Sequence, residues 1–276
     1  MTGLEGKVAL ITGAARGQGR SHAVRLAEAG ADIIAIDICA NIETMDYPNA
    51  SPEDLKETAA QVEALGRRIL TVEADVRDAA ATRAAVDRGH EIFGRIDIVL
   101  SNAGIVRLSD DPEDYAQMWD DVVSTNLSGG FHVVNAAVPH IISGGHGGSI
   151  VFTGSTAGVR PTANLNTAAL AYTASKWGLV GICKQYAASL AEHSIRVNIV
   201  HPTGVASGMT MNEAMGRLVE EAAAGGKNSI AEMQNAMPID ILQPSDISDA
   251  IAFLVSDQAK WITGVSLPVD AGFSVR

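Results

Sequence analysis

The stretch VALITGAARGQG, residues 8–19, decides the fold that we expect for this chain. Val8–Thr12 is a short run of strand-forming residues, and small and aliphatic side chains recur at helical spacing after position 19. Between these two segments lie Gly13, Gly17 and Gly19. Glycines let a backbone turn sharply and approach a pyrophosphate, and the N-terminus of the next helix offers free N–H groups. The stretch therefore predicts a strand–turn–helix unit that binds the phosphates of a dinucleotide.

The residues around this turn predict which nucleotide it binds. Asp37 ends the next predicted strand, where its carboxylate can bond both hydroxyls of the adenosine ribose and would repel a 2′-phosphate. Ile38 follows without a positive charge, so NAD is expected and not NADP. Arg16 and Gln18 of the turn are expected to contact the cofactor, although Arg16 would equally suit a solvated position. A P-loop is excluded because no Gly-Lys-Ser/Thr ends the turn.

Apolar strands and helical segments alternate along the whole chain. The predicted strands are Val8–Thr12, Asp32–Asp37, Ile69–Ala74, Ile96–Ser101, Ser149–Thr153, Arg196–Val200 and Ser266–Val269. Apolar strands that are joined by helices imply a mostly parallel sheet with both faces covered. We therefore predict an α/β fold in a single domain, residues 1–276. It is a Rossmann-like, doubly wound parallel sheet of about seven strands with helices on both faces.

The composition narrows the classes of function. The chain has 276 residues, 47% of them hydrophobic, and a formal net charge of −12. No nucleic-acid partner is expected, because phosphate binding needs concentrated Lys and Arg. No apolar run approaches the roughly 18–20 residues that span a bilayer. Cys39 and Cys183 form no disulfide framework, and the histidines show no ligand spacing, so His22 and His201 are expected to be structural. We expect a cytoplasmic protein that handles small molecules without a metal.

Three residues in the second half of the chain predict a catalytic site. Tyr172 and Lys176 are four apart at the start of a predicted helix, so they share one face. An adjacent ammonium and a positive nicotinamide ring both favour the phenolate over the phenol. Ser155 ends the fifth predicted strand, at the sheet edge where ligands bind, and its hydroxyl can hold a substrate oxygen. Tyr-x-x-x-Lys alone also suits a surface tyrosine beside a lysine, and the order of these residues along the fold favours catalysis.

Together these motifs resemble the short-chain dehydrogenase/reductase family over nearly the whole chain. The matching residues are Thr12-Gly13-x-x-x-Gly17-x-Gly19, Asp75-Val76, Asn102-Ala103-Gly104, Asn126, Ser155, Tyr172-x-x-x-Lys176 and Pro202-x-Gly204. The resemblance implies reversible oxidation of a secondary alcohol to a ketone with NAD. Tyr172 would take the hydroxyl proton, Ser155 would hold the oxygen, and Lys176 would lower the pKa of the tyrosine and bind the nicotinamide ribose. Asn126 would complete the tetrad by holding a water that links Lys176 to solvent.

The resemblance also implies the remaining cofactor contacts. Asp75 would bond the adenine amino group, Val76 would flank the ring, and Asn102-Ala103-Gly104 would pack against the adenosine. The loop after the sixth strand would hold the carboxamide with Pro202, Gly204, Val205 and Ser207. Two departures stand out in this sequence. Thr203 interrupts the family's Pro-Gly, and Ser155 and Tyr172 are 17 apart, which suggests a small insertion within Arg160–Ala169.

A long connection, Ile38–Ser51, separates the second strand from its helix, where two to six residues are usual. With Asp37-Ile38-Cys39-Ala40 and His201-Pro202-Thr203-Gly204-Val205, it resembles the carveol dehydrogenase-like, mycofactocin-associated subgroup. That resemblance implies that the insertion covers the cofactor and holds it between turnovers. A separate redox carrier would then reoxidise the bound NADH. The alternative is a surface loop on an enzyme that exchanges NAD in the ordinary way.

A second long segment, Ala206–Asp240, is predicted to be a substrate lid, with Gly225-Gly226 as a hinge. It holds five of the eight methionines: Met209, Met211, Met215, Met233 and Met237. Methionine adapts to irregular apolar shapes, so the substrate is expected to be an apolar cyclic or terpenoid-like alcohol. Ordinary packing of two short helices is the alternative for this segment.

The expected partners follow from the enzyme reading: a small alcohol or ketone, the redox carrier, and no nucleic acid or membrane. Relatives in the family suggest a homotetramer built through helices that here would include Asp111–Ala137 and Tyr172–Glu192. Two other functions remain open. One is a non-catalytic module that binds NAD, which loss of Tyr172 or Lys176 would have favoured. The other keeps the tetrad and performs dehydration or epimerisation.

Overall fold

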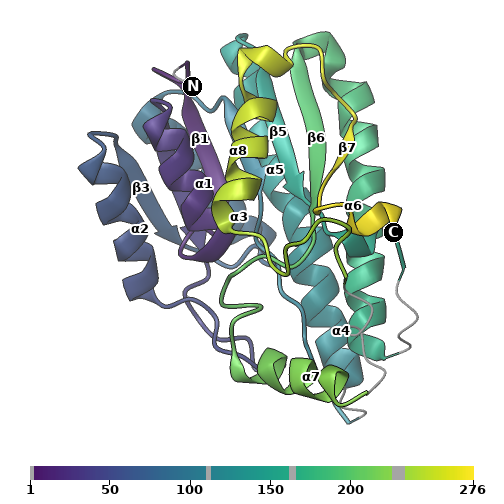
Figure 1. Ribbon diagram of the computed structural model, residues 1–276. Coiled ribbons are helices and arrows are strands. Elements are labelled where there is room, and N and C mark those ends of the chain that lie inside the picture. Colours follow the sequence, from purple (N-terminus) through teal and green to yellow (C-terminus); the bar gives the residue numbers. More distant parts are fainter. Residues whose placement is uncertain (1–2, 110–112, 162–165, 226–233) are drawn as a thin grey trace.

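A computed structural model describes residues 3–109, 113–161, 166–225 and 234–276 of the chain. At its centre is one parallel sheet of seven strands in the order β3-β2-β1-β4-β5-β6-β7 (Figure 1). The strands are β1 Val8–Thr12, β2 Asp32–Asp37, β3 Ile69–Glu73, β4 Ile98–Ser101, β5 Gly148–Thr153, β6 Ile195–Pro202 and β7 Ser266–Val269. The predicted fold class is confirmed, and the predicted strand ends differ from these by at most two residues.

Helices cover both faces of the sheet. They are α1 Gly17–Glu28, α2 Pro52–Ala64, α3 Ala79–Phe93, α4 Tyr115–Val123, α5 Gly129–Gly144, α6 Thr167–Leu190, α7 Glu213–Ala223 and α8 Pro244–Val255. α1, α2 and α8 share one apolar core with the sheet, which includes Leu26 and Ile251. α3, α5 and α6 share a second core on the other face, which includes Val133 and Leu179. The strand order reverses between β1 and β4, so a ligand crevice is expected at their carboxyl ends.

The predicted helix over Asp111–Ala137 is interrupted. The described part begins with α4 at Tyr115, passes through the π-helical segment Ser124–Ser128, and continues as α5 to Gly144. Asp111 itself lies outside the described residues. The π segment carries Asn126 and turns its side chain toward the loop after β4, where it is hydrogen-bonded. Such one-turn bulges are frequent at functional sites.

Two segments leave the layered body at the carboxyl edge of the sheet. Ile38–Ser51 runs between β2 and α2 without helix or strand, and α7 lies off the sheet beyond the strand ends (Figure 1). α2 then begins sharply, because the Ser51 hydroxyl accepts the Asp54 N–H and the Asp54 carboxylate accepts the Ser51 N–H, with Pro52 in the first turn. No helix of the described chain is long and apolar enough to cross a membrane.

Candidate active site

A cavity of about 330 Å³ opens at the carboxyl ends of the central strands, and the predicted site residues meet there. Those that line it are Gly13, Arg16, Gly17, Gln18, Gly19, Asp37, Ile38, Asp75, Val76, Asn102, Ala103, Gly104, Ser155, Tyr172, Lys176, Pro202, Gly204, Val205 and Ser207. Asn126 is the one predicted site residue that does not line the cavity. Residues that are far apart in the sequence therefore line one cavity, as expected where the strand order reverses between β1 and β4.

The glycine turn has the backbone geometry of a phosphate cradle. Gly13 and Gly17 have φ of +65° and +55°, in the region that favours glycine. A Cβ on Gly19 would lie 1.9 Å from the carbonyl oxygen of Gly13, so no other residue fits without moving the turn. α1 begins at Gly17 and presents the free N–H groups of its first turn to the cavity. Gln18 also lines this space, and its buried Oε1 has no hydrogen-bond partner among the described residues.

Asp37 joins the turn to the end of β2. Its carboxylate accepts the N–H of Ala15 at 2.9 Å and the N–H of Cys39 at 3.1 Å. Burial raises the pKa of Asp37, and these N–H groups oppose the shift. Each carboxylate oxygen accepts one of these bonds, which leaves a lone pair on each for a ribose hydroxyl. Asp37 thus shapes the glycine turn and also lines the cavity.

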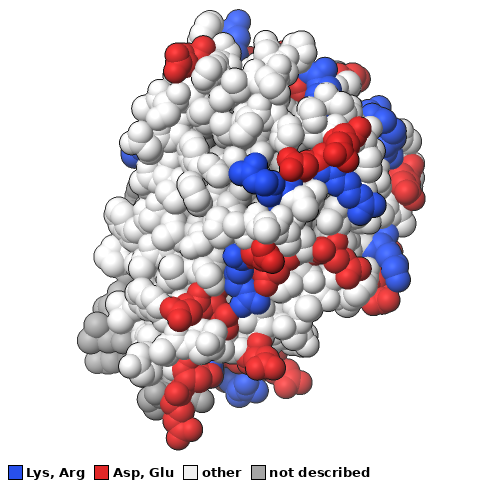
Figure 2. All heavy atoms as spheres, turned by 180° about the vertical axis from the view of Figure 1, so that it is seen from behind, with Lys and Arg blue, Asp and Glu red and all other residues white. Residues whose placement is uncertain are grey.

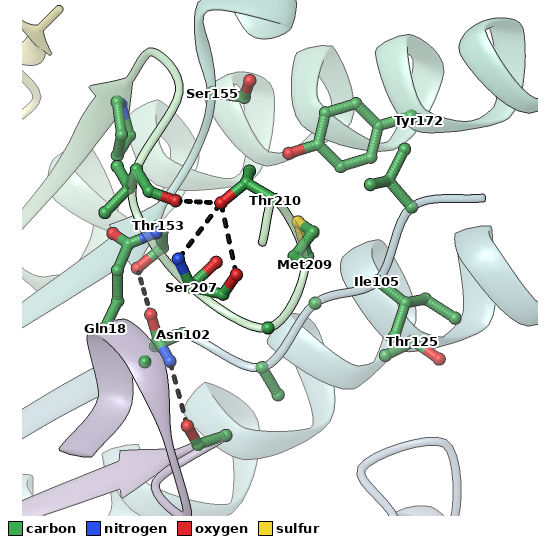
Figure 3. Close-up of a pocket in the computed structure, with 18 of the residues that line it drawn as sticks. Gln18, Asn102, Ile105, Thr125, Thr153, Ser155, Tyr172, Ser207, Met209 and Thr210 are labelled. Atoms are coloured by element: carbon green, nitrogen blue, oxygen red, sulfur yellow. Dashed lines mark hydrogen bonds between the residues drawn. The ribbon is translucent and has the colours of Figure 1, made fainter. Parts of the chain in front are cut away.

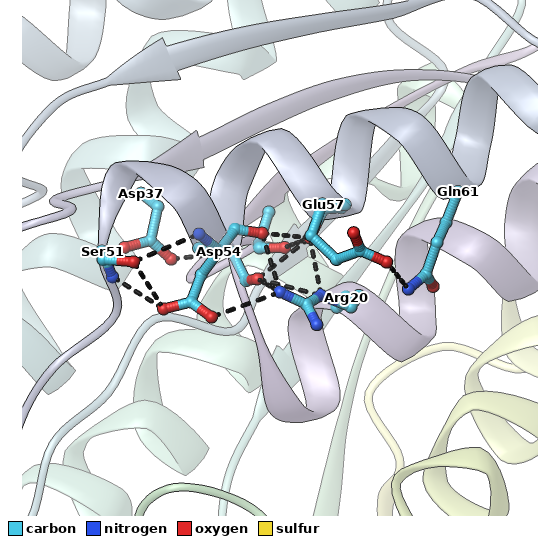
Figure 4. Close-up of polar contacts among 9 residues, drawn as sticks. Arg20, Asp37, Ser51, Asp54, Glu57 and Gln61 are labelled. Atoms are coloured by element: carbon cyan, nitrogen blue, oxygen red, sulfur yellow. Dashed lines mark hydrogen bonds and ion pairs between the residues drawn. The ribbon is translucent and has the colours of Figure 1, made fainter.

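A polar network behind the turn fixes α1 against α2 (Figure 4). The Arg20 guanidinium donates to the carbonyl oxygens of Ala15 and Asp54, at 2.6 and 2.7 Å. The Thr58 hydroxyl, fully buried, donates to the same Ala15 carbonyl at 3.0 Å. These bonds occupy the Ala15 carbonyl and hold the turn in place against α2.

Two predicted cofactor contacts have protein partners. Arg16 donates to the carbonyl oxygen of Pro48 at 2.5 Å, so it binds the Ile38–Ser51 insertion and is not simply solvated. Asp75 forms an ion pair with Arg77 at 2.7 Å, and Arg77 forms a second ion pair with Asp121 on α4. Both side chains still line the cavity.

Ser155, Tyr172 and Lys176 come together from the turn after β5 and from one turn of α6. The prediction that Ser155 ends the fifth strand is wrong, because β5 ends at Thr153 and Ser155 caps the short turn Thr156–Gly158. Figure 3 shows Ser155 and Tyr172 at the same cavity. The Lys176 ammonium donates to the Thr153 carbonyl at 2.9 Å and lies 5.4 Å from the centre of the Tyr172 ring. Burial lowers the pKa of Lys176 to about 8. Burial also raises the pKa of Tyr172, which a hydrogen bond with Ser155 opposes. Burial, and not the ammonium, therefore decides the direction in which the pKa of Tyr172 is shifted.

Asn126 lies behind the cavity wall and is bonded to Ile105, which lines the cavity. Its side chain donates to the Ile105 carbonyl at 2.9 Å and accepts the Ile105 N–H at 2.8 Å. It also donates to the Ser175 hydroxyl, which in turn donates to the carbonyl of Tyr172. Asn126 thereby ties the loop after β4 to the helix that carries the tyrosine and lysine.

The insertion contributes contacts that sequence reasoning missed. The Tyr47 hydroxyl accepts the Val106 N–H at 3.3 Å, and the Asp46 carboxylate accepts the Ser109 N–H at 2.7 Å. Thr44 donates to Asp121 at 2.7 Å. Ile42, Tyr47, Asn49 and Ala50 line the cavity. The length of the segment marked it as unusual, but nothing in its composition indicated that its partners lie on the loop after β4.

The remaining wall of the cavity is mostly apolar and comes from several segments: Val106, Leu108, Ala169, Met209, Met215, Leu218 and Phe273. Of the five methionines that were predicted to serve a lid, Met209 and Met215 line the cavity, whereas Met211 and Met237 are exposed. Met233 and Gly226 lie outside the described residues, as do 162–165 of the suggested small insertion.

Two more lining residues, Arg160 and Thr210, were given no role from the sequence. Arg160 donates to the Phe273 carbonyl at 2.9 Å, so the C-terminal turn closes one side of the cavity. Thr210 accepts the Ser207 N–H and donates to the Val205 carbonyl (Figure 3). Thr210 therefore holds the predicted carboxamide loop from within.

Comparisons with known proteins identify the family. A family model described as short chain dehydrogenase matches residues 7–217. The (-)-trans-carveol dehydrogenase of Rhodococcus erythropolis is 43% identical, over 100% of both chains. The chain belongs to the short-chain dehydrogenase/reductase family.

Solved structures support the cofactor. Carveol dehydrogenase from Mycobacterium avium in complex with NAD matches with a TM-score of 0.92 and 47% identity, over 100% of both chains. A short chain dehydrogenase from Mycobacterium paratuberculosis bound to NAD matches with a TM-score of 0.89 and 41% identity, over 99% of each chain. The glycine turn, the unpartnered Gln18 oxygen and the Asp37 carboxylate fit the same cofactor. The chain is an NAD-dependent oxidoreductase, and the predicted family and cofactor are confirmed. No group of side chains in the described residues is arranged to hold a metal ion.

Proposed function

We propose that the protein interconverts a secondary alcohol and a ketone, and that its substrate is an apolar cyclic or terpenoid-like alcohol. The observation that carries the proposal is the meeting of Ser155, Tyr172 and Lys176 in the cavity that the glycine turn also lines. NAD, when bound, supplies the nicotinamide carbon that exchanges a hydride with the substrate. A non-catalytic NAD-binding module is disfavoured because the tetrad is complete. Dehydration or epimerisation is disfavoured by the chain length and the glycine spacing.

The side chains have separate tasks in this reaction. In oxidation, Tyr172 as phenolate accepts the proton of the substrate hydroxyl, while a hydride leaves the carbon atom that bears this hydroxyl. A ketone forms, and the proton stays on the phenol. Ser155 holds the substrate oxygen. Lys176 stabilises the phenolate and binds the nicotinamide ribose, and Asn126 orders the loop and the proton path beside it. The bonds from Asn126 to Ile105 and Ser175 support this ordering role.

Tyr172→Phe tests the assignment, because it removes the phenol and keeps the ring. We expect turnover to fall by about 10²–10⁴-fold, the usual contribution of a general base, while NAD stays bound. Tyr115→Phe is the control, since Tyr115 is exposed on α4 and does not line the cavity. Activity near wild type in Tyr172→Phe would remove this residue from the mechanism.

The pH dependence has a defined sign. Because burial raises the pKa of Tyr172, the phenolate fraction grows as pH increases toward that pKa. Alcohol oxidation needs the phenolate and should accelerate with pH, whereas ketone reduction needs the phenol proton and should slow. Rates in both directions across a pH series measure this, and parallel profiles would contradict the role of Tyr172.

The apolar wall supports the substrate class. Each CH₂ that moves from water into such a wall contributes roughly 0.8 kcal/mol, so a terpenoid ring gains far more than a small polar alcohol. The carveol dehydrogenases among the relatives agree with this class. We expect kcat/KM for carveol to exceed that for small polar alcohols and sugars by at least about tenfold. A preference for polar alcohols would refute the substrate class and leave the reaction type intact.

We further propose that the insertion Ile38–Ser51 retains the cofactor, and that a redox carrier reoxidises NADH in place. The support is that the insertion is bonded to both rims of the cavity, through Arg16 on one side and through Val106 and Ser109 on the other. Mass spectrometry of nucleotide released from extensively desalted, denatured protein tests this. About one NAD per chain is expected; little or none would indicate an ordinary enzyme that exchanges its NAD.

The assembly is proposed from a surface that one chain leaves uncovered. Large apolar side chains are exposed on α4, α5 and α6: Tyr115, Trp119, Phe131, Leu170 and Trp177. Figure 2 shows that charges of both signs gather on one side of this face and leave a wide uncharged area toward α6. We propose a homotetramer that buries this area. Light scattering of the purified protein tests the assembly, and a monomer at micromolar concentration would exclude it.

A further inference from the structure

His201 lies directly behind the serine of the proposed active site. It is the next-to-last residue of β6, its side chain is fully buried, and its Nδ1 is 2.8 Å from the carbonyl oxygen of Ser155. A carbonyl oxygen only accepts hydrogen bonds, so Nδ1 must carry the ring proton. Burial lowers the pKa of His201, which keeps the ring neutral and leaves Nε2 without a proton.

The second ring nitrogen indicates what the histidine is for. Nε2 is buried and has no hydrogen-bond partner within the described residues. A buried polar atom without a partner lowers stability. An apolar side chain of similar size would fill the same space without that loss. What histidine adds at this position is therefore the Nδ1–H donor toward Ser155.

The neighbouring backbone is shaped around the ring. A Cβ on Gly154 would lie 2.6 Å from Nδ1 of His201, so glycine at this position lets the imidazole reach the next peptide. The Gly154 N–H donates to the Val200 carbonyl at 2.7 Å, which joins β5 to β6 just before the serine. The imidazole of His201 adds a second link between the two chain segments, one residue further on, at the Ser155 carbonyl.

Two bonds hold the Ser155 carbonyl, and they do different things. The Gly158 N–H donates to it at 2.8 Å and closes the short turn Thr156–Gly158. The His201 Nδ1–H fixes that turn relative to β6. Within the turn, the Ser155 hydroxyl accepts the Ala157 N–H, and it opposes the burial that raises the pKa of Tyr172. Loss of the histidine donor would leave the turn formed but free to shift against the tyrosine.

We propose that His201 is a positioning residue for the reaction. Its Nδ1–H holds the Ser155 peptide so that the serine hydroxyl stays in reach of the Tyr172 phenol and of the substrate oxygen. His201 itself touches none of the reacting atoms. The inference rests on the proposed function, because it concerns a step of that reaction.

Two variants separate positioning from packing. His201→Leu removes the donor at similar volume, and His201→Asn keeps an N–H where Nδ1 stood. The readout is the rate at which carveol reduces the bound nicotinamide in a single turnover. We expect a loss of about tenfold or more in His201→Leu, typical of a displaced catalytic group, with unchanged NAD content and recovery of most of the rate in His201→Asn. Equal losses in both variants that follow their thermal stability would overturn the proposal.

The pH profile gives a readout that packing alone would not change. A hydrogen bond from Ser155 favours the phenolate of Tyr172, so its loss should move the rise of the oxidation rate to higher pH in His201→Leu. Lys176 and Tyr47, the other titratable groups near the phenol, stay the same in both variants. In a Ser155→Ala background the effect of His201→Leu should vanish, because both changes act through one hydroxyl. Additive losses would refute the mechanism.

A measurement without mutation covers variants that fail to fold. Imidazole ¹⁵N NMR of the wild-type, NAD-loaded protein should show His201 neutral and protonated on Nδ1. Protonation on Nε2 would overturn the proposal. If the wild-type protein oxidised no alcohol at all, the proposed function would fail, and the NMR result would still report on the bond to Ser155.

Discussion

The two ends of the cavity are built in different ways. At the cofactor end, strand ends and the first turn of α1 set the geometry through backbone atoms, with Gly13 and Gly17 at positive φ. At the substrate end, long connections contribute apolar side chains such as Met209, Met215 and Phe273. A backbone cradle has one shape, whereas flexible apolar side chains can repack. From this contrast we expect cofactor choice to depend on a rigid backbone and substrate choice to depend on side chains that can repack.

One glycine at each end gives the strongest test of this contrast. A Cβ on Gly19 would displace the Gly13 carbonyl, whereas a Cβ on Gly216 of α7 would meet no atom within 4 Å. We expect Gly19→Ala to weaken NAD binding by about 100-fold or more, because it moves several N–H donors that each contribute roughly 1.5–3 kcal/mol to a charged ligand. Gly216→Ala should leave NAD content unchanged and raise the free energy of unfolding by up to about 1 kcal/mol. Nucleotide content and chemical denaturation measure both, and similar NAD losses in the two variants would break the contrast.

Asp37→Ala tests how the cofactor end selects NAD over NADP. Removing the carboxylate should reduce the preference for NAD over NADP by about 10- to 100-fold, the value of a charge-assisted hydrogen bond of roughly 1.5–3 kcal/mol. Because Asp37 also holds the N–H groups of Ala15 and Cys39, the alanine variant should bind NAD itself more weakly.

Asp37→Asn is the matched control, since it removes the charge and keeps one acceptor for the turn. Steady-state kinetics with both nucleotides compare the two variants. An unchanged preference in both would show that another group selects the nucleotide.

Asp46→Ala tests the segment that joins the two ends. It frees the N–H groups of Leu108 and Ser109 from the insertion, so cofactor release should accelerate by roughly tenfold, the value of one to two hydrogen bonds. Glu43→Ala is the control, because Glu43 is an exposed acid of the same insertion. Retention of NAD after repeated desalting distinguishes the two, and equal retention would show that the insertion does not hold the cofactor through this contact.

Met215→Leu probes the adaptable end and should have the smallest effect. A volume-conserving swap on an apolar wall usually costs less than about 1.5 kcal/mol, and a flexible wall should absorb most of this. We expect kcat/KM for carveol to change by less than about threefold. A loss of 100-fold, with NAD content intact, would show that the substrate end is as rigid as the cofactor end.

The sequence predicted the cofactor end better than the substrate end for a physical reason. Glycine spacing, Asp37 at a strand end and Tyr172 four residues before Lys176 are local patterns, and the chain order of an α/β sheet brings them to one edge. An apolar residue in the sequence does not indicate whether its side chain will line a cavity, pack in a core or face solvent. Five methionines in one segment predicted an apolar wall, but only Met209 and Met215 among those described line it.

By itself the sequence determined the α/β class, the seven strands and the phosphate turn, because propensity, periodicity and glycine spacing act over a few residues. The tetrad came from the resemblance to a family and stays a prediction. Only the tertiary structure decided which side chains meet when 32 to 63 residues separate them in the chain. It bonded the insertion to the loop after β4 and paired Arg16 with the insertion. It also placed His201, expected to be structural, against the Ser155 carbonyl. Such contacts depend on how strands and loops approach in space, which no local pattern in the chain specifies.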